Sequence, residues 1–418
     1  METPKENRRT LISIGRGIPL YPGLPKPPTS EIHQRMKALQ AHLLASGIDG
    51  ALIVQKADLF YFSLTVQNGH LFVPARGNPI LMVHKNMERA VSEACIDTVV
   101  PLNNPKEIPG ILKTAGVSMP RILGLELDVI PANLYLTYQS LFEKAVLTDI
   151  SPAVRRLRAV KSETEIAMIR RAAQLADQVA ESVPRFLREG MTEVELAGQI
   201  EAVARKLGHQ GIVRMRLWGS ELFYGHLMSG PAAAVPSYLS SPTGGLGPSP
   251  AVAQGPGFRK IKRHEPVLVD YVFAYNGYLA DHTRIFSLGR LPDLLHDRHR
   301  LMLALSGEIR QAAKPGVSAG DIWEKAVAFV RRHGVEDHFM GADDRRIRFV
   351  GHGVGLELDE YPFLANGQAQ RLAAGMTLAL EPKLVMPDVG VVGVENTLLV
   401  TPDGLEPLTR FEEDVIVI

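Results

Sequence analysis

Hydrophobic positions in the first third of the chain change their spacing repeatedly. Between Glu31 and Ser46 apolar residues recur every three or four positions, which predicts a helix that ends at Gly47. Short apolar runs then predict strands at 51–54, 59–64, 70–74, 79–83, 98–102 and 121–127, with helices near 87–95 and 106–115. Because helices alternate with strands, we expect an α/β domain with a mixed sheet that ends near Ile150.

The pattern changes character after Ile150. Residues 154–183 read as a long amphipathic helical region, and Ser162 with Glu165 forms a capping box at the start of its main helix. Helix starts of the same kind stand at Thr192 and Ser318. The chain is therefore expected to have three parts, which are an extended arm over 1–28, an α/β domain over 29–150 and a second α/β domain over 151–418.

Four acids and one histidine stand inside short apolar segments of the second domain. They are Asp270, Asp281, His352, Glu381 and Glu395. Taken singly, each would be read as a salt-bridged core residue or a strand-end cap. A lone charge is costly to bury in such segments, so the ordered set points instead to a shared cation. Four oxygen donors and one nitrogen exceed what one small cation takes from protein, which favours two bridged metal ions.

Composition and charge exclude several classes of function. The 46 Lys and Arg residues nearly balance the 45 Asp and Glu residues, so no overall field attracts nucleic acid or acidic membranes. The apolar runs are of strand length, and the N-terminus lacks the apolar stretch of a secretory signal. A single cysteine, Cys95, rules out internal disulfides and a cysteine-based metal site. We expect a soluble cytoplasmic protein that acts without nucleic acid or membrane.

The chain resembles the M24 metallopeptidase superfamily, the pita-bread fold of methionine aminopeptidase, prolidase, aminopeptidase P and creatinase. The resemblance covers roughly residues 30–410 and includes the junction LRAVKSETEI at 157–166. Its motifs occur together and in family order, with Asp281 eleven positions after Asp270, GHGVG around His352, LEP around Glu381 and VENT around Glu395.

The resemblance implies a creatinase-like N-terminal domain ahead of a pita-bread catalytic domain, and it implies a role for each of the five residues. Asp270 would hold one metal ion with both oxygens, and Asp281 and Glu395 would bridge both ions. His352 and Glu381 would complete the other shell. Thr283 follows Asp281 by two positions and is expected to support the shell through its hydroxyl.

The implied reaction is hydrolysis of an amide bond by a hydroxide that bridges two divalent ions. Glu381 is the candidate that passes the proton to the leaving nitrogen. An oxygen-rich site with one imidazole accepts Mn, Co, Zn or Fe according to availability. The family also implies a homodimer and a small peptide or other small molecule as substrate.

Three positions depart from the family pattern. Peptidases of the family usually carry a histidine seven residues after the metal histidine, where this chain has Asp359. A second histidine usually ends a segment before the first metal strand, where this chain has Ser237. Proline-specific members often place an arginine two residues before the last glutamate, where this chain has Gly393. An ionised Asp359 would repel an oxyanion that develops on the substrate. Without an arginine at position 393, there is no guanidinium there to bind a substrate carboxylate.

These departures leave the substrate open. The candidate catalytic residues are Glu381, Asp359 and His226, the last as a stand-in for a missing histidine, and the candidate substrate-binding residues are Ser237, Glu360 and Gly393. The main hypothesis is an Xaa-Pro aminopeptidase-like or dipeptidase-like metallohydrolase. The alternative is a non-peptidase relative that acts on a small cationic or zwitterionic metabolite, by creatinase-like C–N hydrolysis or a related lyase reaction. A binding module without catalysis is disfavoured because all five ligand positions are present.

Overall fold

The computed structural model describes residues 24–342 and 346–418, which divide into two compact units between Leu157 and Arg158. The expected arm at 1–28 lies outside the described residues except for 24–28, which have no regular secondary structure. Within the described ranges no helix is both long and apolar enough to cross a membrane.

The described part of the first unit is a six-stranded sheet with helices. The sheet has the order β4-β3-β2-β1-β5-β6, with β1, β2 and β3 antiparallel and the other neighbours parallel, so it is mixed as predicted. Its strands are β1 (Gly50–Ile53), β2 (Gly69–Pro74), β3 (Ile80–Val83), β4 (Thr98–Pro101), β5 (Ile122–Leu125) and β6 (Val146–Asp149). Its helices are α1 (Thr29–Ala45), α2 (Lys56–Ser63), α3 (Met87–Glu93), α4 (Ile108–Thr114) and α5 (Ala132–Leu141).

The strand predicted at 59–64 is wrong, because these residues belong to helix α2. The side chain of Gln55 accepts a hydrogen bond from the backbone N–H of Asp58 at 2.8 Å and caps the helix. Most of α2 is buried, so no polar face reveals a helical period, and a short apolar run cannot be assigned by spacing alone. Helix α5 and strand β6 were not predicted.

In the described part of the second unit, nine strands form the main sheet. Its path is β13-β12-β14-β17-β11-β8-β7, with β18 beside β17 and β19 beside β11. These strands are β7 (Gly225–Ser229), β8 (Val267–Tyr271), β11 (His282–Ser287), β12 (Phe349–Gly353), β13 (Glu360–Ala365), β14 (Thr377–Leu380), β17 (Glu395–Thr401), β18 (Gly404–Pro407) and β19 (Ile416–Val417). Two antiparallel pairs accompany it, β9 (Phe273–Tyr275) with β10 (Tyr278–Ala280) and β15 (Lys383–Met386) with β16 (Gly390–Gly393).

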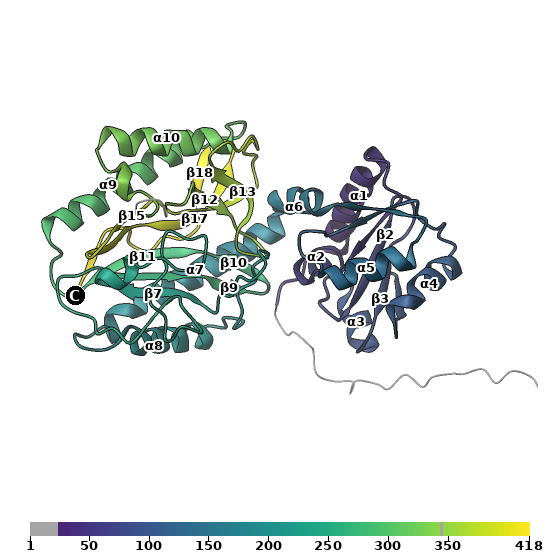
Figure 1. The fold of residues 1–418 in the computed structure, drawn as a ribbon, viewed down its shortest axis with the longest axis horizontal. Coiled ribbons are helices and arrows are strands. Elements are labelled where there is room, and N and C mark those ends of the chain that lie inside the picture. Colours follow the sequence, from purple (N-terminus) through teal and green to yellow (C-terminus); the bar gives the residue numbers. More distant parts are fainter. Residues whose placement is uncertain (1–23, 343–345) are drawn as a thin grey trace, which may run out of the picture. The chain divides into compact units, whose positions relative to one another are not determined.

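Helices cover this sheet on two sides (Figure 1). They are α7 (Glu163–Phe186), α8 (Glu193–Lys206), α9 (Asp293–Ala312) and α10 (Ala319–Arg332), and α6 (Ser151–Ala159) precedes them. Helix α7 packs against α8 and β10, whereas α9 packs against β16 and α10 against β13. The predicted helix starts are confirmed, because Ser162 and Thr192 form capping boxes and Ser318 caps α10.

Residues 267–287 form a hairpin whose two arms are both interrupted, one between β8 and β9 and the other between β10 and β11. Asn276 and Gly277 have positive φ angles of 49° and 90°, as a tight hairpin turn requires. Asp281 falls at the break between β10 and β11, and across the ladder Thr283 pairs with Asp270. The break therefore brings Asp281 near Asp270 without making the two residues direct cross-strand partners.

Candidate metal and active site

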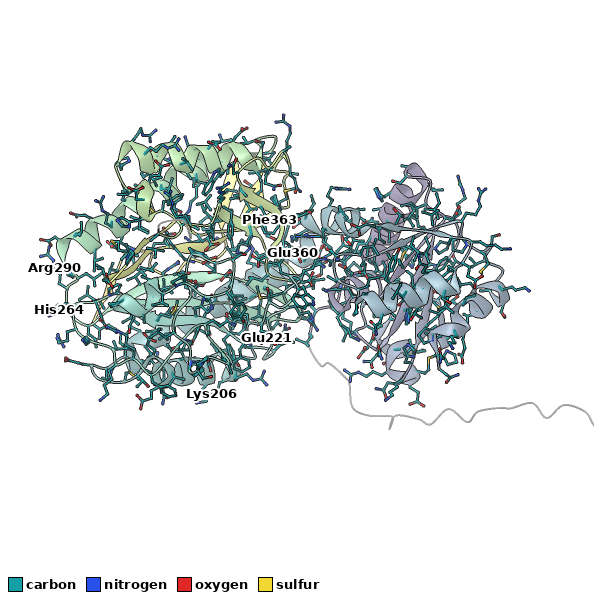
Figure 2. The ribbon with its side chains drawn as sticks, viewed as in Figure 1. Lys206, Glu221, His264, Arg290, Glu360 and Phe363 are labelled. Carbon is teal, nitrogen blue, oxygen red and sulfur yellow. The ribbon has the colours of Figure 1, made fainter. Side chains whose placement is uncertain are left out.

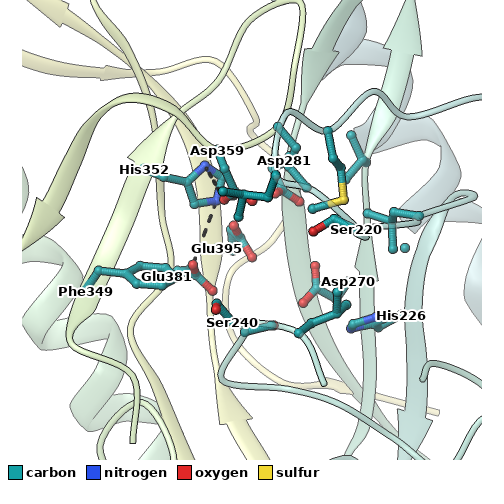
Figure 3. Close-up of a pocket in the computed structure, with 18 residues that line it drawn as sticks. Ser220, His226, Ser240, Asp270, Asp281, Phe349, His352, Asp359, Glu381 and Glu395 are labelled. Atoms are coloured by element: carbon teal, nitrogen blue, oxygen red, sulfur yellow. Dashed lines mark ion pairs between the residues drawn. The ribbon is translucent and has the colours of Figure 1, made fainter. Parts of the chain in front are cut away.

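Neighbouring strands bring the five predicted residues into one pocket (Figure 3). Asp270 lies on β8, His352 on β12, and Glu395 begins β17. Asp281 stands at the break before β11, and Glu381 directly follows β14. Because β12, β14, β17, β11 and β8 are consecutive in the sheet, residues far apart in sequence meet at its centre.

The geometry of three of these residues fits one divalent ion. Asp281, His352 and Glu395 each offer a ligand atom, and these atoms lie within 4.8 Å of one another. His352 Nε2 is 3.8 Å from Asp281 Oδ2 and 3.9 Å from Glu381 Oε1. Ligands bound to one ion at about 2.1 Å stand about 3–4 Å apart, so an inward shift of under about 1 Å is enough.

A hydrogen bond from Nδ1 orients the ring of His352 so that Nε2 faces Asp281 and Glu381. Its Nδ1 lies 3.0 Å from the backbone carbonyl of Gly353, to which it donates. Nε2 then keeps its lone pair for a metal ion, an arrangement typical of metal-ligating histidines. Burial lowers the pKa of His352, but the carboxylates of Asp359, Glu381 and Glu395 outweigh burial and raise it.

The buried acids oppose one another's ionisation. Burial, together with the charges of Glu395 and Asp270, raises the pKa of Asp281 well above its usual value. Burial raises the pKa of Glu381 to about 7. Acids this close are ionised together only when positive charge lies among them. The site is therefore suited to cations.

One cation in the site is a side chain of the protein itself, the ammonium of Lys383, which was not predicted from the sequence. Lys383 begins β15 and is 1% exposed, and its Nζ lies 2.7 Å from Glu395 Oε2, 2.9 Å from Glu381 Oε2 and 3.2 Å from Asp270 Oδ2. Burial lowers the pKa of Lys383, but the three carboxylates raise it well above its ordinary value. The spacing in the sequence could have indicated Lys383. Residues two positions apart in an extended segment face the same side, and Lys383 follows Glu381 by two positions.

The hydroxyl expected from the sequence is in place. Thr283 Oγ1 donates to Glu395 Oε2 at 2.8 Å, so this oxygen accepts from both Thr283 and Lys383. Both hydrogen bonds end on the same oxygen, Oε2. The contact fixes the orientation of a ligand carboxylate, as supporting hydrogen bonds do in metal sites.

Asp359 and His226 both line the pocket. Asp359 Oδ1 is 3.7 Å from His352 Nδ1, so this acid stands beside the candidate metal histidine. His226 pairs with Asp270 across β7 and β8, and its ring nitrogens lie 3.4 Å from Thr243 Oγ1 and 3.3 Å from Gln254 Oε1. Burial lowers the pKa of His226, so its ring is neutral near pH 7. A catalytic role for either residue stays a prediction.

Two candidate substrate-binding positions are not among the residues that line this pocket. Ser237 Oγ accepts a hydrogen bond from the backbone N–H of Leu239 at 3.1 Å, and the pocket is lined by Ser240 and Ser241 instead. Gly393 is the cross-strand partner of Lys383 and has a φ of 152°. A Cβ at Gly393 would lie 2.4 Å from the carbonyl oxygen of Pro382 and 2.7 Å from Lys383 Cα. No side chain fits there while β15 and β16 keep this pairing.

The third candidate, Glu360, is labelled in Figure 2. It is part of a buried ion-pair cluster and is likewise not among the pocket residues. Its carboxylate contacts the guanidinium of Arg158 and lies 3.1 Å from Lys161 Nζ. Burial favours the neutral acid, but Arg158 and Lys161 together lower the pKa of Glu360 to about 2. These contacts give Glu360 a role in stability.

Glu360→Gln is expected to lower the free energy of unfolding by about 3 kcal/mol near pH 7, because it removes the carboxylate that pairs with buried Lys161 and one of the two that pair with buried Arg158. The folded pKa of Glu360 of about 2 lies below its ordinary value of 4.5, so the ion pairs stabilise the fold fully above pH 4.5. Below it, the difference between wild type and variant should shrink by about 1.4 kcal/mol per pH unit. Urea unfolding at pH 7.0 and 3.5 measures both quantities.

The matched control is Glu336→Gln, which removes an exposed ion pair with Arg331 and should leave the free energy of unfolding close to that of wild type. If wild type and Glu360→Gln had equal free energies of unfolding and the variant had a raised KM, Glu360 would again be a candidate for substrate binding.

Family models match both parts of the chain. Residues 167–402 match the family model of metallopeptidase family M24, and residues 35–160 match the creatinase/prolidase N-terminal domain. The chain is 26% identical to the Xaa-Pro dipeptidase of Pyrococcus furiosus over 387 residues, which is 92% of this chain and 99% of that protein.

Solved structures share the fold. The Xaa-Pro dipeptidase from Bacillus anthracis matches with a TM-score of 0.79 and 23% identity, over 93% of this chain and 100% of that one. The prolidase from Pyrococcus furiosus matches with a TM-score of 0.73 and 25% identity, over 89% and 99% of the two chains. The predicted fold class, a creatinase-like α/β domain followed by a pita-bread domain, is confirmed. The chain belongs to metallopeptidase family M24.

Proposed function

We propose that this protein hydrolyses the amide bond of a short peptide, in the manner of an Xaa-Pro dipeptidase or aminopeptidase. The observation that carries the proposal is the convergence of Asp281, His352 and Glu395, with Glu381 beside them, in one pocket. Membership of a metallopeptidase family makes the chain a metallohydrolase, and the relatives named as Xaa-Pro dipeptidases support the peptide substrate.

Asp281, His352 and Glu395 would hold one divalent ion in this site. A bound ion of this kind polarises a substrate carbonyl and lowers the pKa of a water molecule. The donor set of oxygens and one imidazole suits Mn, Co, Zn or Fe. A second ion, as expected from the sequence, would need Asp270, whose Oδ2 already accepts a hydrogen bond from Lys383.

Glu381 is the residue that we assign to proton transfer. It lines the pocket, and its Oε1 faces His352 Nε2 at 3.9 Å while its Oε2 accepts from Lys383. One oxygen is thus held in place and the other points to where the reaction would occur. A carboxylate placed in this way can take a proton from water and return it to the leaving nitrogen.

The pocket walls indicate the chemical character of the substrate. Several of the lining side chains are apolar, namely Met215, Leu217, Leu222, Val272, Phe349 and Leu358. Asp359 adds a carboxylate, and the described residues that line the pocket include no lysine or arginine for an anionic group. We therefore propose a substrate with a cationic group near Asp359 and an apolar side chain along the wall. A peptide amino terminus meets this description.

Asp359 also favours the alternative function, because a small cationic or zwitterionic metabolite carries the same charge. One experiment separates the two. The metal-free chain is loaded with Mn, Co or Zn and given a library of Xaa-Pro dipeptides and tripeptides, alongside a panel of small guanidino and ammonium metabolites. We expect metal-dependent release of the N-terminal residue, which stops with chelator and returns with metal. Turnover of metabolites without any peptide cleavage would overturn the peptidase proposal.

Two predictions about the whole chain stay predictions. The single cysteine, Cys95, is a free thiol, which supports a reducing cytoplasmic location. A homodimer is expected from the family alone. Light scattering on the purified chain would test the dimer.

A further inference from the structure

We propose that the ammonium of Lys383 takes the place of a second metal ion, so that this chain binds one divalent ion and not two. The inference rests on the proposed function, since it concerns the ion expected in the same pocket. It differs from the expectation of two ions, which was drawn from the five ligand positions without Lys383.

The ammonium is fully engaged by acids that were expected to hold metal. Its three N–H donors match three acceptors, on Asp270, Glu381 and Glu395, at 3.2, 2.9 and 2.7 Å. Each bond joins two charged groups, so each is stronger than a neutral hydrogen bond. Lys383 therefore occupies a complete binding site for a cation, made of side chains that the sequence assigned to a metal.

One acid faces two cation positions. Glu381 directs Oε1 toward His352 Nε2, on the side of the Asp281, His352 and Glu395 ligands, and directs Oε2 toward Lys383. Its two oxygens are thus divided between an ion position and an ammonium. This is the arrangement of a carboxylate that bridges two cations, with the lysine in one of the two places.

A second ion does not fit beside the ammonium. An ion bound at about 2.1 Å to Glu395 Oε2 would lie within about 5 Å of Lys383 Nζ, because the lysine is 2.7 Å from the same oxygen. If that ion also bound Asp270 Oδ2, it would compete for two of the three acceptors of Lys383. The ion and the ammonium would then repel each other at short range inside the protein.

The backbone holds Lys383 in this position. Lys383 pairs with Gly393 across β15 and β16, and its carbonyl accepts a hydrogen bond from Met340 N–H at 3.0 Å. Gly393 has no side chain to collide with the lysine, whereas a Cβ there would lie 3.0 Å from Lys383 Cγ. The residue opposite Lys383 is thus a glycine, which leaves room for the side chain that supplies the ammonium.

The test is the number of metal ions bound per folded chain. The full chain is stripped with chelator, loaded with excess Mn²⁺ or Zn²⁺, freed of unbound metal and measured by native mass spectrometry and elemental analysis. We expect one ion per wild-type chain. Lys383→Met keeps the length of the side chain but removes its charge, so it should bind two ions per chain. Lys383→Arg keeps the charge and should stay at one.

The matched control is Lys325→Met, at a lysine whose side chain is 40% exposed, which should stay at one ion. Circular dichroism checks that each variant is folded. If Lys383→Met does not fold, Lys383→Gln replaces it, and the wild-type count still decides. Two ions in the wild type, or one ion in a folded neutral variant, would overturn the proposal. No ion in the wild type would instead overturn the metal site of the proposed function.

Discussion

Replacing Asp281 with asparagine is expected to abolish metal binding and hydrolysis together while the chain stays folded. Asp281 Oδ2 lies 3.8 Å from His352 Nε2 and is one of three ligand atoms that converge on one point. An amide has no charge to attract a divalent ion, so kcat/KM should fall by at least about 1000-fold. The fold should persist because asparagine keeps the acceptor for the backbone N–H of His282, now at 2.9 Å from Oδ1.

Thermal unfolding with and without Mn²⁺ separates lost binding from lost structure. The ion should raise the Tm of the wild type, because a ligand that binds only the folded state stabilises it, and should leave the Tm of Asp281→Asn unchanged. The control is Asp293→Asn, at a surface acid that is 79% exposed, which should keep both metal and activity. Wild-type turnover in the Asp281 variant would contradict the ligand assignment.

Glu381→Gln is expected to lower kcat by about 100-fold to 10,000-fold with a small change in KM. Glutamine has the same shape but cannot accept and return a proton, whereas substrate contacts along the apolar wall are unchanged. Steady-state kinetics on the best peptide of the library give the two constants. Metal content is measured in the same sample, so that a loss of kcat is not confused with a loss of the ion.

The control for this variant is Glu308→Gln, at an acid that is 40% exposed, which should leave kcat unaltered. An unchanged kcat in Glu381→Gln with the wild-type metal content would contradict the proton-transfer role. Another acid of the pocket, Asp359, would then be the next candidate.

Features whose cause is local were predictable from the sequence. The capping box at Ser162 and Glu165 depends on residues three positions apart, and the structure confirms it. The metal-type set was predictable for a different reason. Charges inside apolar strands are costly to bury, so the positions of Asp281 and Glu395 predicted a shared cation.

What could not be predicted depends on partners that are distant in sequence. Glu360 contacts Arg158, which is 202 positions away, so nothing near Glu360 separates a structural ion pair from substrate binding. Lys383 reaches Asp270 over 113 positions. Strand alternation could place Lys383 on the face of Glu381, but only the fold shows that its ammonium meets three carboxylates.

The most direct test of the central claim, a single-metal site completed by an ammonium, is anomalous X-ray diffraction from crystals loaded with Mn²⁺. We predict one anomalous peak per chain, bounded by Asp281, His352 and Glu395, with Lys383 Nζ still in contact with Asp270. Two peaks that share Glu395, with the side chain of Lys383 turned away from Asp270, would contradict the account.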